Sequence, residues 1–131
     1  MPGYTVRNLK DDVEDAAPKF GLSPNLEARF AVRELELGKL GMSYQRLAPN
    51  FRVPFGHKHE AQEEVYVVLA GSGRIKLDDE VVDLNQWDAV RIENDTMRCV
   101  EAGADGIEFI AIGAPFEGAN DVEMVQGWWA D

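Results

Sequence analysis

The sequence predicts an all-β fold, either a sandwich or a barrel of short strands, on three observations. From Met42 onward, polar and apolar residues alternate in short runs, as they do in strands that bury one face. Turn-forming residues interrupt these runs roughly every eight to twelve residues, a spacing typical of all-β domains. The run at residues 64–69 is rich in Val and Tyr, which favour strands. No internal repeat or low-complexity tract is present.

The N-terminal part of the chain is predicted to be mixed. Residues 4–9 alternate and are predicted to form an edge strand. Asn8 is then placed to cap a short acidic helix over residues 11–17, which Pro18 ends. This part therefore supplies short helical segments beside a mainly β domain.

Residues 26–40 fit a helical spacing and a strand alternation equally well. We expect a strand at about residues 28–33. An irregular turn follows it and ends at Gly38 or Gly41.

The remaining elements are short strands separated by turns. Pro54 interrupts one of them, so a sheet edge or a bulge is expected there. Gly71-Ser72-Gly73 is predicted to be a turn, and residues 78–80 a tight hairpin. The predicted strands are residues 42–47, 51–59, 64–69, 74–77, 81–84, 87–92, 97–101 and 107–112.

Two histidines one residue apart form the most informative pattern in the chain. In a strand, His57 and His59 point to the same face. After a short turn, Glu64 opens the next strand, and antiparallel pairing of the two strands would bring all three side chains together. Two imidazoles and a carboxylate are a ligand set for a first-row divalent metal, and an open set of this kind suits non-haem iron.

The segment from His57 to Gly71 resembles the first motif of the cupin superfamily. In that motif two alternating histidines are followed, after a short spacer, by a glutamate and then by a glycine. Glu64 and Gly71 match this spacing, which makes Glu63 the solvent-side neighbour of the inward carboxylate. The chain is similar to small single-domain bacterial cupins.

The resemblance implies a jelly-roll barrel, the double-stranded β-helix of cupins, within one domain of residues 1–131. The barrel core would cover about residues 42–114. Residues 1–41 would then be an N-terminal extension and residues 115–131 a C-terminal tail.

The second cupin motif is degenerate in this chain. It normally supplies a glycine, a proline, a second glycine, a fourth ligand histidine and an asparagine. At the matching positions the sequence has Trp87, Glu93, Asp95, Arg98 and Ala102. The fourth ligand position therefore carries Arg98, a permanent cation without an acceptor atom.

Two interpretations of Arg98 remain open. In the first, a divalent metal (Fe, Mn, Ni or Zn) is bound by His57, His59 and Glu64, and Arg98 holds an anionic group of a small-molecule ligand, such as a carboxylate or phosphate. In the second, Arg98 pairs with Glu64 in a metal-free, non-enzymatic barrel that binds or senses a small molecule. Cupins include enzymes, binders and regulators, so the fold does not decide whether this protein is an enzyme.

Four further side chains are candidates for lining the mouth of the barrel, namely Tyr44, Arg46, Phe55 and Tyr66. The alternative is that these aromatic residues are simply part of the core. Cys99 follows Arg98 and should point away from the pocket by alternation, which favours packing over nucleophilic chemistry.

Composition excludes several classes of partner. A net charge of −11 argues against nucleic acid and anionic lipid. No apolar run approaches a membrane span, and the N-terminus lacks a signal pattern. The single cysteine fits a reducing, cytoplasmic location. We expect a homodimer in which the strand at residues 4–9, or the tail carrying Trp128 and Trp129, crosses to the other subunit.

Overall fold

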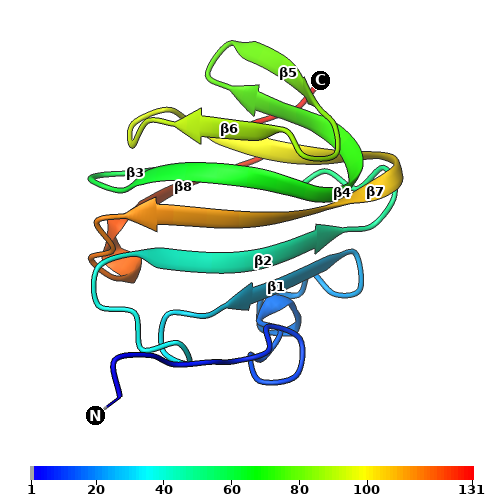
Figure 1. The fold of residues 1–131 in the computed structure, drawn as a ribbon. Coiled ribbons are helices and arrows are strands. Elements are labelled where there is room, and N and C mark those ends of the chain that lie inside the picture. The colour runs from blue at the N-terminus through cyan, green and yellow to red at the C-terminus, as the bar shows by residue number, and fades with distance from the viewer. Residues whose placement is uncertain (1) are drawn as a thin grey trace.

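In a computed structural model that describes residues 2–131, the chain forms a curled β structure with two short 3₁₀ helices (Figure 1). This confirms the predicted all-β jelly roll with short N-terminal helical elements. No helix in the described part of the chain is long and apolar enough to cross a membrane. The elements in order are η1 Ala17–Phe20, β1 Leu26–Phe30, β2 Gly41–Leu47, β3 Phe55–His59, β4 Glu63–Leu77, β5 Glu80–Leu84, β6 Ala89–Ile92, β7 Arg98–Ala114, η2 Ala119–Asp121 and β8 Val122–Gln126.

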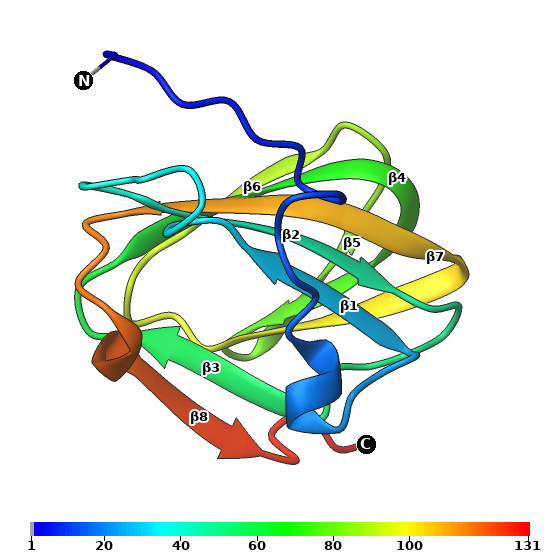
Figure 2. The same cartoon turned by 90° about the horizontal axis from the view of Figure 1, so that it is seen from below.

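The two long strands β4 and β7 organise the barrel. They are antiparallel partners from the pair Glu63 and Ala114 to the pair Leu77 and Arg98, with register shifts near Gly71. One half of this ribbon lies beside β2, β1 and β6, and the other half lies beside β3, β8 and β5. The ribbon thus passes from one curled layer to the other, and Figure 2 shows the two layers facing each other.

Two glycines allow this ribbon to bend. Gly71 and Gly106 have φ values of 74° and 75°, in the left-handed region that favours glycine. A Cβ at Gly71 would also collide with the carbonyl oxygen of Gly106. The predicted turn at residues 71–73, and the break expected between the strands at 97–101 and 107–112, are therefore bends within β4 and β7 rather than the ends of strands. The glycines therefore correctly indicated unusual backbone geometry at these positions. The expectation that the strands end there was wrong.

The core lies between the two layers and follows the alternation of the strands. On β4 the inward residues include Tyr66, Val68 and Ile75, which are at most 3% exposed. They pack against inward residues of β7, and the ring of Tyr66 stacks on that of Phe109 at 5.0 Å between centroids. A core of this kind fixes the inner face of each strand, and with it the direction of His57 and His59.

The N-terminal predictions are partly wrong. Residues 4–9 form no strand, and residues 11–16 form no helix: residues 11–13 are a turn and a bend, and Asp15 forms an isolated β-bridge with Arg29. Asn8 does cap a turn, because its side-chain oxygen accepts hydrogen bonds from the backbone N–H groups of Lys10 and Asp11. Pro18 lies at the start of η1 instead of ending a helix, which is a position that proline tolerates well.

The barrel extends beyond the range expected for its core. β1 lies before residue 42, and β8 lies after residue 114 and pairs with all five residues of β3. Trp87 does not begin a strand. It sits in a turn with φ of 72°, and β6 starts at Ala89.

Candidate metal centre

Three donor groups converge inside the barrel. His57 and His59 alternate on β3 and therefore share a face, and Glu64 lies near the start of β4. Nε2 of His59 is 3.1 Å and Nε2 of His57 is 3.8 Å from Oε1 of Glu64. The three candidate ligand atoms all lie within 4.8 Å of one another.

Arg98 is the fourth side chain in contact with this cluster. It lies opposite His57 in the pairing of β3 with β7, and it is 0% exposed. Its Nη1 donates to Oε1 of Glu64 at 2.7 Å, and the guanidinium also donates to the backbone carbonyls of Glu93 and Thr96. The guanidinium is thus held by the protein and offers no surface to a ligand in this arrangement.

A further acidic residue that sequence reasoning missed holds His59 from the other side. Nδ1 of His59 is 3.1 Å from Oδ2 of Asp121, at the end of η2. Asp121 also accepts hydrogen bonds from the backbone N–H groups of Ala61 and Gln62, at 2.8 and 3.3 Å. It lies 62 residues beyond His59 in a segment with no motif, so the sequence carries no local signal for it.

The electrostatics of the cluster favour an ionised Glu64. Burial alone would raise the pKa of Glu64, but the hydrogen bonds of both imidazoles and the charge of Arg98 hold that pKa well below its usual value. Burial lowers the pKa of His57, and the Arg98 cation adds to this effect against the opposing influence of Glu64. Neutral imidazole and ionised carboxylate are the protonation states that metal binding requires.

The spacing of the donors fits a divalent ion. Ligand atoms about 2.1 Å from a metal lie about 3.0 Å apart at a right angle and farther apart at wider angles. The separations of 3.1 and 3.8 Å from Glu64 fall in this range. Glu64 would have to share its carboxylate between the ion and Arg98. On that condition, His57, His59 and Glu64 fit a divalent metal ion.

The other predicted pocket residues divide into two sets. Phe55 is half-buried and shares the inward face of β3 with His57. Tyr66 is inward but is 3% exposed and packed in the core, where burial raises its pKa well above the usual value.

Tyr44 and Arg46 do not lie at the mouth of the barrel, which corrects the prediction. They lie on the face of β2 opposite the core residue Leu47. Tyr44 donates to Glu108, and Arg46 donates to Glu27. Alternation correctly predicts that the two share a face, but it does not say which face is inward.

The C-terminal tail packs on the outer face of the layer that contains β3. Trp128 lies against Gly56, where a Cβ would come within 2.6 Å of its ring. Trp129 is 7% exposed, and the guanidinium of Arg52 lies over its ring at 4.1 Å. Cys99 also faces outward, as predicted, and its thiol donates to the carbonyl of Val53.

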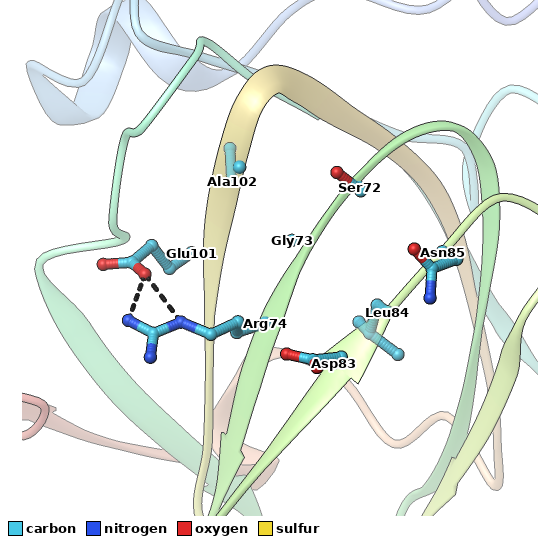
Figure 3. Close-up of a pocket in the computed structure, with 9 residues that line it drawn as sticks. Ser72, Gly73, Arg74, Asp83, Leu84, Asn85, Glu101 and Ala102 are labelled. Atoms are coloured by element: carbon cyan, nitrogen blue, oxygen red, sulfur yellow. Dashed lines mark hydrogen bonds and ion pairs between the residues drawn. The ribbon is translucent and has the colours of Figure 1, made fainter.

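A surface pocket of about 290 Å³ lies away from the imidazoles (Figure 3). Its wall includes Arg74 and Glu101, which Figure 3 shows paired side by side, with Asp83 nearby. None of the three donor residues lines it, so this pocket is separate from the candidate metal centre.

Comparisons with known proteins agree with the fold. Neither a protein-family model nor a curated protein matches the chain. A cupin protein from Bacteroides fragilis is 28% identical with a TM-score of 0.72, over 91% of this chain and 92% of that one. KdgF from Halomonas sp. is 18% identical with a TM-score of 0.69, over 88% and 96% of the two chains. A Streptomyces protein solved with uridine is 14% identical with a TM-score of 0.72, over 96% and 92%.

The two more distant structures show the fold alone, whereas the Bacteroides protein also shares sequence over nearly the whole chain. His57, His59 and Glu64, which match the first cupin motif, lie on inner faces of this barrel. The chain therefore has the cupin fold, and its structure neighbours support a small member of the cupin superfamily.

Proposed function

We propose that this cupin binds a small anionic molecule at a divalent metal ion held by His57, His59 and Glu64. The observation that carries the proposal is the placement of three donor atoms within 4.8 Å of one another on inward faces of the barrel. The bound ion would supply Lewis-acid chemistry and coordination sites for oxygen atoms of the ligand. The donor set suits Fe, Mn, Ni or Zn.

The charges around the site support an anionic ligand. Glu64 and Asp121 carry negative charges, and Arg98 carries a positive one. A divalent ion would therefore leave a net positive centre in a barrel of low dielectric, which an anion neutralises. Because Arg98 is fully buried, we expect it to act on the ligand through its charge and through Glu64 rather than by direct contact.

The test uses protein purified without an affinity tag. Elemental analysis and thermal melts with Mn²⁺, Fe²⁺, Ni²⁺ and Zn²⁺ should show a bound or stabilising ion. An ion at about 100 times its Kd stabilises the fold by about 2.7 kcal/mol. The effect should disappear in His57→Ala and in Glu64→Gln.

The matched control is Glu63→Gln. Glu63 adjoins Glu64 on β4, but its side chain is 63% exposed and pairs with Arg91 at the surface. If Glu63→Gln abolishes the ion response as fully as Glu64→Gln does, the response does not arise at the proposed centre.

A metal-free binding barrel is the second candidate. The observation that favours it is the contact of 2.7 Å between Nη1 of Arg98 and the same Glu64 oxygen that faces both imidazoles. In this case the guanidinium takes the position of the ion, and the barrel binds a small molecule without metal chemistry. A wild type that responds to none of the four ions, beside an Arg98→His variant that does respond, would select this candidate.

We further propose that the protein is a cytoplasmic homodimer. The N-terminal segment leaves the barrel as an extended chain (Figure 2), and Tyr4 and Val6 on it are each 77% exposed. A second subunit would cover these apolar side chains. The Trp128-Trp129 tail is less suited to cross to the second subunit, because it packs on its own barrel. Light scattering that gives a monomer at high micromolar concentration would refute the dimer.

A further inference from the structure

We infer that Asp121 is a positioning residue of the metal centre, which fixes His59 so that Nε2 faces Glu64. This inference rests on the proposed function and assigns part of the site to the C-terminal segment, outside both cupin motifs. The contact joins residues 62 positions apart in the chain.

The ring of His59 lies between two carboxylates. Nδ1 is 3.1 Å from Asp121, and Nε2 is 3.1 Å from Glu64. A neutral imidazole has a single N–H, so it can donate to only one of these groups. A proton on Nδ1 satisfies Asp121 and leaves the lone pair of Nε2 directed at the space beside Glu64. In the metal-bound protein this lone pair binds the divalent ion beside Glu64.

Asp121 is well placed to decide which nitrogen carries the proton. It is 9% exposed and is held by the backbone N–H groups of Ala61 and Gln62. Its own carbonyl accepts a hydrogen bond from the backbone N–H of Glu60 at 2.8 Å. The pairing of His59 with Val122 across β3 and β8 places it directly beside the imidazole. The carboxylate is thus an anchored acceptor, as an orienting group must be.

A purely structural role for Asp121 is the competing explanation, because its carboxylate also closes the turn at residues 60–62. Asp121→Asn separates the two roles. The amide oxygen can still accept from Ala61 at 2.8 Å, whereas the amide N–H₂ takes the place of Oδ2, loses the longer bond from Gln62 and faces Nδ1 of His59 as a donor. The proton should then move to Nε2, and the lone pair that binds metal is lost from the centre.

The control is Glu123→Gln. Glu123 is a neighbouring carboxylate on β8, but it is 65% exposed and pairs with Lys58 rather than with an imidazole. It tests whether loss of any negative charge from this segment weakens the site. We expect it to behave as the wild type does.

The experiment has two readouts. Long-range ¹⁵N–¹H NMR of the metal-free protein at mildly alkaline pH should show His59 protonated on Nδ1 in the wild type and on Nε2 in Asp121→Asn. Titration with Co²⁺, followed by visible absorption, should show roughly 10–100-fold weaker binding in Asp121→Asn, as is typical for loss of an outer-shell partner. The melting temperature of metal-free Asp121→Asn reports the structural role separately.

Two results would overturn the inference: wild-type His59 protonated on Nε2, or an Asp121→Asn variant with an unchanged tautomer and unchanged Co²⁺ affinity. The wild-type spectrum requires no variant, so it decides the matter even if Asp121→Asn does not fold. If the wild type binds no ion, the proposed metal centre fails, but the tautomer of His59 still tests the role of Asp121.

Discussion

The guanidinium of Arg98 and the carboxylate of Glu64 form a buried ion pair, in which Nη1 lies 2.7 Å from Oε1 and Arg98 is 0% exposed. The same oxygen faces Nε2 of His59 at 3.1 Å. A hydrogen-bond donor, Arg98, and a potential metal ligand, His59, therefore meet at one carboxylate oxygen. Whether the Glu64 carboxylate binds only the guanidinium or also a metal ion decides how the site works.

Replacing Arg98 with histidine should make the fold depend on metal. In metal-free buffer, Arg98→His leaves the buried carboxylate without its permanent cation, and the free energy of unfolding should fall by about 3–5 kcal/mol. Added Zn²⁺ or Ni²⁺ should restore stability, because the new imidazole can become a fourth ligand. Urea unfolding with and without the ion measures both effects.

The control for this variant is Arg91→His. Arg91 is 64% exposed and pairs with surface carboxylates, so its loss should change the unfolding free energy little. An Arg98→His protein that is as stable as the wild type in a chelator would show that the ion pair contributes no net stability.

Short-range patterns predicted the donor cluster, whereas its support depended on long-range pairing. Alternation correctly placed His57, His59 and Glu64 on inward faces. The expected antiparallel pairing of their two strands is wrong, because β3 pairs with β7 and β8 and β4 pairs with β5, β6 and β7, so the three donors meet across the interior of the barrel. Asp121 reaches His59 only because β8 pairs with β3, and no local pattern predicts that pairing.

The errors at the N-terminus and at the barrel mouth have the same physical origin. Residues 4–9 alternate as a strand does, but a strand forms only where another strand supplies hydrogen bonds. Tyr44 and Arg46 share a face of β2 as expected, but their direction is set by the other layer. Local sequence fixes periodicity, and tertiary pairing fixes which side is inside.

Gly56→Ala should destabilise the protein through Trp128. A Cβ at this position would lie 2.6 Å from the indole, directly behind the strand that carries His57. Overpacking of this kind typically costs about 1–3 kcal/mol. Denaturant unfolding followed by tryptophan fluorescence measures the loss. Gly38→Ala is the matched control, because a Cβ there meets nothing within 4 Å, and an equal loss in both variants would rule out the Trp128 explanation.

Glu101 should make a pH-dependent contribution to stability. Burial alone would raise its pKa, but hydrogen bonds from Arg74 and Arg52 lower the pKa below the ordinary value of 4.5. A depressed pKa in the folded state stabilises the protein above the unfolded-state pKa, and this contribution is lost as the pH falls through the folded-state pKa. The wild type should therefore exceed Glu101→Gln in stability at neutral pH, and the difference should shrink at acidic pH below 4.5.

The measurement for Glu101 is urea unfolding of both proteins across this pH range. Glu80→Gln, an exposed carboxylate on β5, serves as the control and should show no comparable change. A difference between the wild type and Glu101→Gln that stays constant down to strongly acidic pH would contradict the ion-pair assignment.

Cys99 should be nearly inert towards thiol reagents in the folded protein. It is 3% exposed, its thiol donates to the carbonyl of Val53, and burial raises its pKa from 9.0 to about 11. A shift of this size lowers the thiolate fraction near neutral pH by about 100-fold, and the thiolate is the reacting species. Labelling with an aromatic disulfide, followed by absorbance, should therefore be at least about 100-fold slower in buffer than in denaturing urea. Comparable rates in the two conditions would mean that the outer face of β7 is open, and that the C-terminal tail does not stay packed against this layer in solution.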